Sequence, residues 1–435
     1  MRQPHSRRRF AARLWCLFAG ICWLGLAVAE VSLKITEGVE GATPIAVVPF
    51  GGAQGGDNIG AIVAADLERS GRFTPLPVSA MLEQPTQPSE VRLRSWQTLG
   101  QDYLVIGRVQ PGGGERYVAE FSLYDVLKDA PLLEQRLPFA GAEQRRAAHR
   151  IADIIYQQLT GEAGGFAAPV AFVTVSGRSA QERKYQLQIA DADGFGAHTV
   201  LSSREPIMSP AWSPDGTRLA YVSFEQGSSA VYVQTLATGA RVVVSERKGI
   251  NGAPAWSPSG QELALTLSKD GNPDIYVMAI DSRALRRLTD SPGIDTEPAW
   301  SPDGRSIVFT SDRGGRPQLY RMSAAGGQAQ RISYEGDYNA RGAYSPDGRY
   351  LAMVNGSGGR YRIAVMNLAT GALTHVSRGP LDESPGFSPN GRMLLYAARI
   401  DGAARLVATP LAGGREQVLQ IGPADARQPA WSPRE

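Results

Sequence analysis

Three sets of residues in this chain could take part in chemistry. Asp191-Ala192-Asp193-Gly194 resembles the opening of a calcium-binding loop, and the glycine-rich run 51–56 lies between an expected strand and an expected helix, where phosphate loops occur. Glu297 and Glu383 are carboxylates that could serve as the acid and base of a hydrolase or lyase. Each of these interpretations requires additional groups nearby.

The additional groups are missing from the sequence. No glutamate completes the calcium loop, so we expect a plain hairpin turn, and the glycine run lacks both the Lys-Ser/Thr ending and the dinucleotide spacing. No Gly-x-Ser-x-Gly elbow supplies a nucleophile, and His149, His198 and His375 fall in separate predicted elements. We therefore predict no catalytic residue, no metal site and no cofactor. An enzyme that uses the two glutamates stays open as the alternative.

The strongest pattern is a repeated aromatic residue followed by Ser-Pro and, in most copies, a turn. Successive serines are 44, 44, 44, 43 and 44 residues apart. This period, with several short strands per unit, is typical of a β-propeller with one four-stranded blade per repeat. Three strands precede the first copy and none follows the sixth, so we predict six blades closed by the C-terminal strand. The six aromatic residues are Trp212, Trp256, Trp300, Tyr344, Phe387 and Trp431.

The repeated residues have a structural explanation. In Ser-Pro-Asp-Gly, proline presets the first turn position, aspartate caps its own turn and glycine takes the position with positive φ. We expect the aromatic residue to pack between neighbouring blades. A sugar or choline site lined by six aromatic rings is the less favoured alternative.

The first 29 residues form a separate segment. Five arginines between positions 2 and 13 precede an apolar run at 14–28, and Ala27-Val28-Ala29 is a small-x-small cleavage site. These are the features of a secretory signal peptide, whose removal would leave Glu30 first. Arginines at 7–9 also fit a twin-arginine signal, so the choice between Sec and twin-arginine export stays open.

Removal of this segment changes the charge and the cysteine content. The whole chain has 45 basic and 42 acidic residues, and the segment takes away five arginines and no acidic residue. The remainder is close to neutral, with no basic patch for nucleic acid. Both cysteines, Cys16 and Cys22, leave with the segment, which excludes disulfides and thiolate metal sites. We expect an exported protein that is not embedded in a membrane and holds its shape by packing.

The chain between the signal segment and the repeats has the pattern of a mixed α/β domain. A buried strand at 45–50 precedes a helix that we expect to begin at Asp57 and stop at Gly71. A longer helix with one apolar face is expected at 142–159. Further strands are predicted at 73–76, 103–109, 117–124 and 132–139, and a further helix at 91–99.

Together these patterns predict two domains, an N-terminal α/β domain followed by an all-β six-bladed β-propeller closed by the C-terminal strand. We divide the chain into a signal peptide (1–29), an N-terminal segment (30–43), the α/β domain (44–162), a glycine-rich linker (163–169) and the propeller (170–435).

One face of the propeller is the expected binding surface. The segments before each Pro-Ala-aromatic strand connect successive blades, and by rotational symmetry all emerge around the mouth of the central channel. They are longer and more varied than the turns opposite, which suits a protein or peptide partner better than a buried small molecule. The segments are 203–209, 246–254, 290–298, 334–342, 378–385 and 422–429.

A series of motifs, in order along the chain, points to a known family. They are Ile62-Val63-Ala64-Ala65-Asp66-Leu67, Met208-Ser209-Pro210-Ala211-Trp212-Ser213-Pro214-Asp215-Gly216, Asn251-Gly252-Ala253-Pro254, Thr296-Glu297-Pro298, Thr310-Ser311-Asp312, Gly315-Arg316-Pro317-Gln318 and Pro429-Ala430-Trp431-Ser432-Pro433. In these motifs the chain resembles the TolB proteins over essentially its whole length after the signal segment. The resemblance implies a non-enzymatic component of the periplasm, part of the Tol–Pal system that supports outer-membrane integrity and envelope constriction at cell division.

The resemblance also implies that the lipoprotein Pal binds at the channel mouth. Carried onto this chain, the Pal-contacting positions are Ala253 and Thr296, with Glu297 beside them, and Ile250 where the family has a histidine. Arg341 and Glu383, from neighbouring connections, complete the candidate Pal site.

A second implied partner, TolA, would bind the N-terminal segment, whose order the family couples to Pal binding. Other outer-membrane proteins and colicins are further candidate partners, and we expect a monomer. A periplasmic propeller hydrolase or lyase acting through channel carboxylates stays as the alternative. The candidate TolA-binding residues are Glu30, Val31, Leu33, Ile35, Gly38 and Val39.

Overall fold

The N-terminal domain is built on a mixed sheet in the strand order β3-β1-β4-β5-β6, with β2 paired to β4. The computed structural model describes residues 41–52, 56–177, 179 and 181–433. The predicted signal peptide and residues 30–40 of the predicted TolA-binding segment therefore lie outside the described residues, and our division of the chain stays a prediction. The strands are β1 (Thr43–Val47), β2 (Gly51–Gly52), β3 (Phe73–Pro75), β4 (Tyr103–Gly113), β5 (Arg116–Asp125) and β6 (Ala130–Ala140); the helices are α1 (Ile59–Arg69), α2 (Leu93–Thr98) and α3 (Gln144–Thr160).

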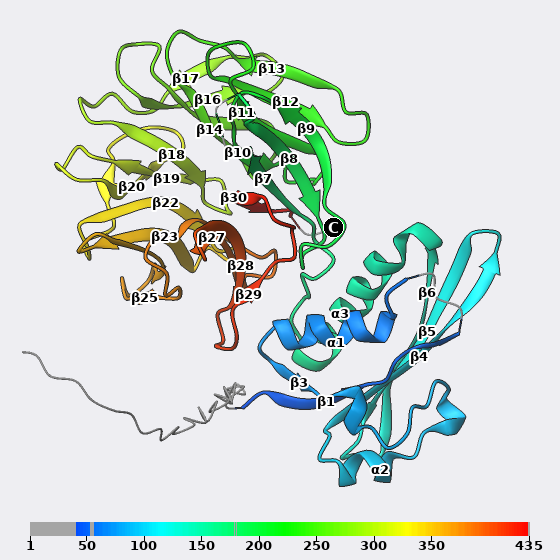
Figure 1. Ribbon diagram of the computed structural model, residues 1–435. Coiled ribbons are helices and arrows are strands. Elements are labelled where there is room, and N and C mark those ends of the chain that lie inside the picture. Colours follow the sequence, from blue (N-terminus) through cyan, green and yellow to red (C-terminus); the bar gives the residue numbers. More distant parts are fainter. Residues whose placement is uncertain (1–40, 53–55, 178, 180, 434–435) are drawn as a thin grey trace, which may run out of the picture. The chain divides into compact units, whose positions relative to one another are not determined.

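Two helices cover one face of this sheet. Figure 1 shows α1 and α3 side by side next to β4, β5 and β6. Ile59 and Leu67 of α1 and Ile151 and Ile155 of α3 are fully buried in the core that these helices share with the sheet. The apolar face predicted for the second long helix is thus the one that packs on the strands, as expected for an amphipathic helix.

The start of α1 differs from the expectation. Asn58, not Asp57, caps the helix, because its side-chain oxygen accepts the N–H of Gly60 at 2.9 Å and the N–H of Phe50 at 2.9 Å. Asp57 instead forms an ion pair with Arg145 of α3. The stop is as predicted, since Gly71 lies just beyond the helix with a φ of +70°.

The sequence predicts a flexible connection for the glycine-rich run at 51–56, but its first two residues form the strand β2. Gly51 and Gly52 pair with Arg108 and Val109 of β4 in parallel. A Cβ on Gly52 would lie 2.1 Å from the Val109 carbonyl oxygen, so the close approach of the two chains requires glycine there.

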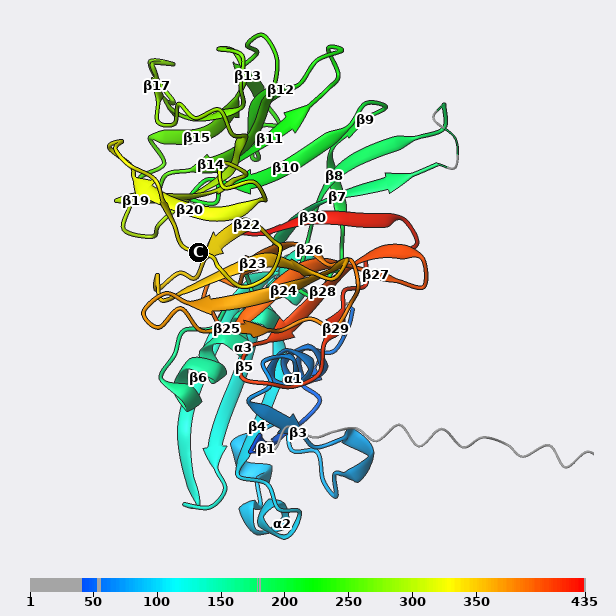
Figure 2. The ribbon, with the colours of Figure 1, turned by 90° about the vertical axis from the view of Figure 1, so that its left-hand side faces the viewer.

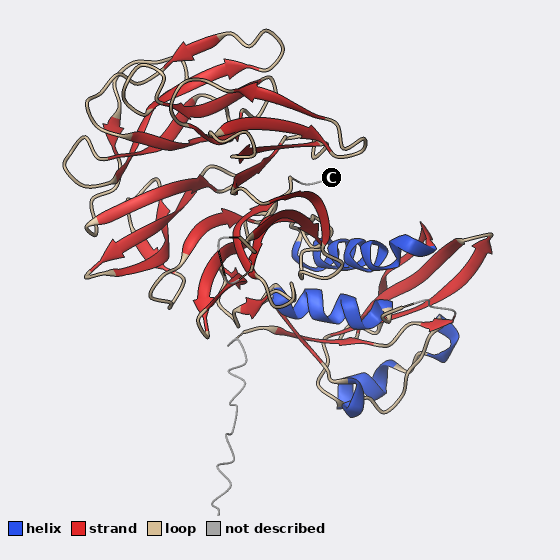
Figure 3. Cartoon of the chain, turned by 45° about the horizontal axis from the view of Figure 1, so that its top comes forward, coloured by secondary structure: helices blue, strands red, loops and turns tan. Residues whose placement is uncertain are grey.

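The C-terminal domain is a six-bladed propeller. Six four-stranded antiparallel sheets follow one another, and Figure 3 shows that strands and loops build this domain while the long helices belong to the first. Blade one consists of β10 (Ile207–Trp212), β11 (Arg218–Ser223), β12 (Ala230–Thr235) and β13 (Arg241–Ser245), and blade two of β14 (Asn251–Trp256), β15 (Glu262–Leu267), β16 (Asp274–Ala279) and β17 (Leu285–Arg287). Blade three consists of β18 (Asp295–Trp300), β19 (Ser306–Ser311), β20 (Gln318–Ser323) and β21 (Gln330–Arg331), and blade four of β22 (Tyr338–Tyr344), β23 (Tyr350–Ser357), β24 (Arg360–Asn367) and β25 (Leu373–His375). Blade five consists of β26 (Glu383–Phe387), β27 (Met393–Ile400), β28 (Ala403–Pro410) and β29 (Gln417–Val418).

The sixth sheet, which we call the closing blade, joins the two ends of the domain as predicted. Its order is β30 (Asp425–Trp431), β7 (Val170–Ser176), β8 (Lys184–Ala190) and β9 (His198–Ser203). Trp431 pairs with Val170 in the antiparallel register, and Figure 2 shows β30 beside β7. Closure leaves no unpaired sheet edge at the junction.

The Ser-Pro turns behave as the sequence suggests. In blade three, the Asp303 carboxylate accepts hydrogen bonds from the Ser301 hydroxyl and from the N–H of Arg305, and these bonds hold the pKa of Asp303 below its ordinary value. Gly304 follows with a φ of +70°, the conformation that glycine adopts most easily.

The aromatic residues of the repeats link neighbouring blades. Trp256, for example, packs in the apolar cluster shared by the first two blades, together with Val222 and Leu263. Trp212, Trp256 and Trp300 also donate the indole N–H to a backbone carbonyl of the preceding blade, whereas Trp431 donates to Ala168, just before β7 of its own blade. These bonds run from Trp212 to Ala430, Trp256 to Ala211, Trp300 to Ala255 and Trp431 to Ala168, over 3.0, 3.2, 3.1 and 3.1 Å.

Replacing Trp300 with phenylalanine tests this link. The variant keeps an aromatic ring but leaves the Ala255 carbonyl without its donor, so we expect the free energy of unfolding to fall by about 1–2 kcal/mol. Phe387 occupies the same position in blade five, which shows that the fold accepts a ring without an N–H. Urea denaturation followed by fluorescence measures the change. A stability equal to that of the unchanged protein would mean that the hydrogen bond contributes nothing.

Candidate functional site

The innermost strand of every blade is interrupted by a bulge that faces the channel. The pairing register shifts at the same place in β10, β14, β18, β22, β26 and β30. At each shift one non-glycine residue has a positive φ, between 45° and 59°. We call these six residues the channel ring: Ser209, Ala253, Glu297, Arg341, Ser384 and Gln428.

The repeated bulge is a property of the architecture. Residues before proline normally avoid helical φ/ψ, and a left-handed non-glycine residue costs about 1–3 kcal/mol. In five of the six blades a proline follows the ring residue, and proline has no N–H that a bulge would leave unpaired. Because all six blades share the bulge, the backbone is equivalent around the ring and only the side chains distinguish one blade from another.

The bulge corrects one expectation about the predicted site. We expected Ala253, Thr296, Glu297, Arg341 and Glu383 to lie in connecting loops, but all five lie in inner strands. Each inner strand continues beyond its proline, because the bulge absorbs the residue that cannot pair. The side chains are therefore held by a sheet and not by a loop.

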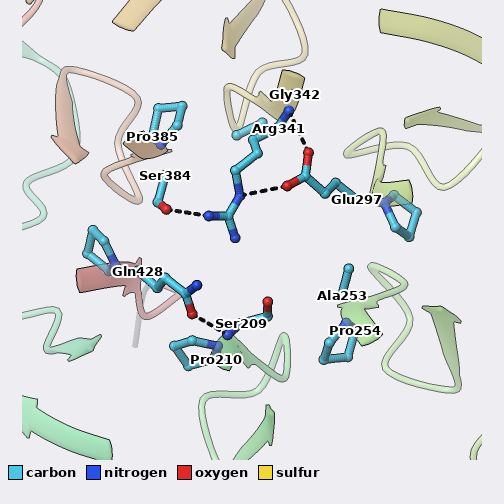
Figure 4. Close-up of a pocket in the computed structure, with 13 residues that line it drawn as sticks. Ser209, Pro210, Ala253, Pro254, Glu297, Arg341, Gly342, Ser384, Pro385 and Gln428 are labelled. Atoms are coloured by element: carbon cyan, nitrogen blue, oxygen red, sulfur yellow. Dashed lines mark hydrogen bonds and ion pairs between the residues drawn. The ribbon is translucent and has the colours of Figure 1, made fainter. Parts of the chain in front are cut away.

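The ring surrounds a small cavity in the channel. Its volume is about 150 Å³, and Figure 4 shows side chains from all six inner strands around it. Of the sequence-predicted Pal-site residues, Ala253, Glu297 and Arg341 line this cavity. Ser209, Ser384 and Gln428 line it as well and were not predicted.

An ion pair joins two neighbouring ring residues, Glu297 of blade three and Arg341 of blade four. The Glu297 carboxylate lies 3.2 Å from the Arg341 Nε, and its other oxygen accepts the N–H of Arg341 at 3.1 Å and the Thr310 hydroxyl at 2.9 Å. The Arg341 guanidinium then donates to the Ser384 hydroxyl, as Figure 4 shows. Three adjacent ring positions are thus fixed by charge-assisted hydrogen bonds.

The opposite side of the ring has shorter and uncharged side chains. The Gln428 side-chain oxygen accepts the N–H of Ser209 at 2.6 Å, and Ala253 presents only a methyl group. The channel ring is therefore asymmetric, with a charged arc and a neutral arc. A partner that enters the channel meets different chemistry on its two sides.

The remaining predicted residues surround the cavity without lining it. Thr296, next to Glu297, is bonded to the hydroxyl of Thr266 at 3.3 Å. Glu383 is exposed at the start of β26, and Ile250, directly before β14, is 48% exposed.

In four of the six repeats a large apolar or aromatic side chain lies three residues before the ring residue, and together these side chains form an apolar rim. Ile250, Ile294 and Leu381 occupy this position in blades two, three and five and are 48%, 48% and 51% exposed. Tyr338 takes the same position in blade four, where burial and the Glu297 carboxylate raise its pKa, which keeps its hydroxyl neutral. Exposed apolar side chains around a polar centre are a common arrangement in protein-binding surfaces.

The enzymatic alternative finds little support in this geometry. Glu297 is ion-paired with Arg341, and Glu383 does not line the cavity, so the two carboxylates do not converge on one position. The stretch Asp191–Gly194 forms the hairpin turn that we predicted, with the Gly194 N–H bonded to the Asp191 carbonyl at 2.8 Å.

Comparisons with known proteins identify the family. A model described as the TolB beta propeller domain matches residues 156–435, and one described as the TolB amino-terminal domain matches residues 31–132. The chain belongs to the TolB family. A TolB protein from Methylococcus capsulatus, named as a Tol-Pal system protein, is 63% identical over 98% of this chain and 100% of its own length.

Two further TolB proteins agree with this assignment. One from Nitrosococcus oceani is 48% identical over 55% of this chain and 58% of its own length. The crystal structure of TolB from Acinetobacter baumannii matches with a TM-score of 0.83 and 42% identity, covering 90% of this chain and 97% of that one. The family resemblance found in the motifs is thereby confirmed, as is the fold. TolB proteins are a non-enzymatic family of the Tol–Pal system, and no helix in the described part of this chain is long and apolar enough to span a membrane.

Proposed function

We propose that this protein is a periplasmic adaptor of the Tol–Pal system that binds Pal at the channel mouth and TolA through its N-terminal segment. It would support outer-membrane integrity and envelope constriction at cell division, without catalysis. Membership of the TolB family supports the Tol–Pal role. The asymmetric channel ring is the observation that supports the position of the Pal site.

The proposed Pal surface has two layers. The outer layer is the apolar rim, which includes Ile250, and the inner layer is the channel ring with Glu297 and Arg341. Apolar rim residues would supply area, while the fixed ion pair would supply specificity for a partner with complementary polar groups. Thr296, next to Glu297 in β18, and Glu383, next to the ring residue Ser384 in β26, complete the surface.

The proposed TolA site is the segment 30–43, of which residues 30–40 lie outside the described part of the chain. Its residues Glu30, Val31, Leu33, Ile35, Gly38 and Val39 are carried over from the family pattern in the sequence. A short segment that can dock or detach would be a two-state element, whose population one partner shifts for the other.

Deletion of residues 30–38 from the mature chain tests this division of labour. We expect binding to a purified TolA domain to be lost and binding to Pal to be retained, because the deletion removes the TolA segment and the coupling through it but leaves the Pal surface intact. Isothermal titration calorimetry with each partner measures both affinities. Loss of both interactions, with an unchanged melting temperature, would contradict separate sites.

A further inference from the structure

A cluster of charged side chains away from the channel joins α3 to the closing blade. Arg145 of α3 contacts three carboxylates: its Nη1 lies 2.6 Å from Asp57, its Nε 3.1 Å from Asp191 and its Nη2 2.5 Å from Asp193. Its guanidinium carbon also lies 3.9 Å from the centre of the Phe195 ring. Asp191, Asp193 and Phe195 all belong to the turn between β8 and β9, so one side chain connects the two domains.

A second residue of α3 points at the same turn. His149 lies one helical turn after Arg145, and its side chain is 2% exposed. Its Nδ1 is 2.6 Å from Asp66 of α1, and its Nε2 is 3.6 Å from Asp191. Asp66 also forms a buried ion pair with Arg69. The imidazole therefore lies between a carboxylate of its own domain and one of the propeller.

These surroundings favour a proton on His149. Burial lowers the pKa of the imidazole, but the carboxylates of Asp66 and Asp191 outweigh it and raise that pKa to about 9. Burial raises the pKa of Asp191, but His149 and Arg145 outweigh burial and hold that pKa below its ordinary value. Asp153, on the same helix, accepts the N–H groups of Phe166 and Ala167, and burial raises its pKa to about 6.

Protonation of His149 brings the charges of the cluster closest to balance. Four carboxylates, those of Asp57, Asp66, Asp191 and Asp193, face the two guanidinium groups of Arg69 and Arg145. A proton on His149 supplies a third positive charge at the point nearest to Asp66 and Asp191. Without it, the buried carboxylate Asp66 keeps a single cationic partner, and burial of an incompletely paired charge is unfavourable.

The cluster contains groups of the kind that bind metal ions, but an arginine fills their centre. One ligand atom from each of His149, Asp191 and Asp193 lies within 4.8 Å of the others. Arg145 already bonds both aspartates, so its guanidinium holds the place that a cation would take. The geometry therefore points to an ion-pair contact and not to a metal centre.

We propose that Arg145, His149, Asp191 and Asp193 form an ionic clasp that holds the α/β domain on the closing blade and opens as a unit. The described residues fall within one compact unit, and the clasp lies in that unit at the boundary of the two domains. Polar contacts with partial solvent access are easier to break and re-form than an apolar interface, and Arg145 keeps 19% of its side chain exposed. The linker keeps the domains connected when the clasp is open.

The proton on His149 makes the clasp sensitive to pH. When the clasp opens, Asp191 leaves the imidazole but Asp66 stays beside it, so the pKa of His149 falls from about 9 toward its ordinary value. The closed form therefore has its full stabilisation below the pKa of the open form and loses it as the pH rises through about 9. The pKa of His149 depends on the charged groups around it. These are Arg69 and Arg145 and the carboxylates of Asp57, Asp66, Asp153, Asp191 and Asp193.

Distance measurements across the two domains test the clasp. The chain from Glu30 onward contains no cysteine, so spin labels can be placed at Gln135→Cys in β6 and Ala237→Cys in the β12–β13 turn, both exposed. We expect one narrow distance distribution at pH 6.5 and a second, longer or broader component at pH 9.5. In R145Q the second component should already be present at pH 6.5, with a population roughly tenfold above that of the unchanged protein.

Control variants separate the clasp from general destabilisation. R136Q removes an arginine that pairs with Glu120 within the α/β domain and should leave the distribution unchanged. Circular dichroism checks folding, and if R145Q unfolds, the milder D193N decides. The proposal would be overturned if the distance distributions of R145Q matched those of the unchanged protein at both pH values. The same holds for D193N where it replaces R145Q.

Discussion

Replacing Glu297 with lysine is expected to weaken Pal binding by about 100-fold, or about 3 kcal/mol. The carboxylate of Glu297 organises the charged arc of the channel ring, since it bonds both the side chain and the backbone N–H of Arg341. A lysine there would place two cations side by side in a confined channel. Any partner group that matches the present ion pair would then meet repulsion.

A graded series makes this prediction specific to charge. Glu297→Gln keeps the shape and the hydrogen-bond acceptor but removes the charge, and we expect a loss of about tenfold. Glu416→Lys, on the exposed connection between β28 and β29, makes the same charge change away from the channel and should leave the affinity unchanged.

Calorimetry with a soluble Pal domain measures the affinities, and scanning fluorimetry checks that each variant folds. If Glu297→Lys binds Pal as tightly as the unchanged protein, the site is not at the channel mouth. If Glu416→Lys loses affinity equally, the effect is one of net charge alone.

Removal of the chain from Pro423 onward is the second large change, and it should abolish cooperative folding of the propeller. The deletion takes away β30 and with it the antiparallel pairing to β7. It also removes Trp431, whose ring packs in the cluster of the closing blade and whose indole N–H bonds the Ala168 carbonyl.

The expected loss is as large as the stability of a typical domain. Deleting a fully buried aromatic side chain costs about 3–5 kcal/mol, of which the half-buried Trp431 contributes a part, and each lost hydrogen bond adds about 1 kcal/mol. Domains of ordinary stability have about 5–15 kcal/mol in total. The exposed edge of β7 would in addition favour aggregation.

Rescue in trans gives the matched control. A synthetic peptide of residues 423–433 should restore a cooperative thermal transition by pairing with β7, whereas a scrambled peptide of the same composition should not. A truncated protein that melts cooperatively at the original temperature without any peptide would show that closure by β30 is dispensable.

The fold could be predicted from the sequence because its signals are local and repeated. The Ser-Pro turns recur at a nearly constant interval, and each turn residue, such as Asp303 or Gly304, has a chemical role that does not depend on distant parts of the chain. The cap of α1 was predicted one residue too early, because Asp57 and Asn58 are both good capping residues. Only the pairing of Asp57 with Arg145, 88 residues away, decides between them.

The candidate site could be predicted only in part. The repeat interval also places Ser209, Ser384 and Gln428 in register with Ala253 and Glu297, so these residues could have been found by counting back from each proline. Nothing local in the sequence indicates that the residue before proline adopts a left-handed conformation, because local preference opposes it. The bulge that the inner strands share overrides that preference.

The ionic clasp was not predicted at all. Its two halves, on α3 and in the β8–β9 turn, are separated by more than 40 positions along the chain, and the Asp191–Gly194 turn has no sequence feature that distinguishes it from an ordinary hairpin. Contacts of this kind depend on the relative placement of two domains, which the pattern within either domain does not contain.

The equivalence of the six bulges has a consequence for how homologous proteins can diverge. The backbone already holds each ring residue in its unusual conformation. A single substitution therefore changes the side chain that a binding partner contacts in the channel, without any rearrangement of the blades. The six ring positions have equivalent backbone surroundings. The order of acidic, basic, amide, hydroxyl and methyl groups around the channel can therefore change by one substitution in one blade at a time. Related chains could thus acquire new binding preferences while their blades stay the same.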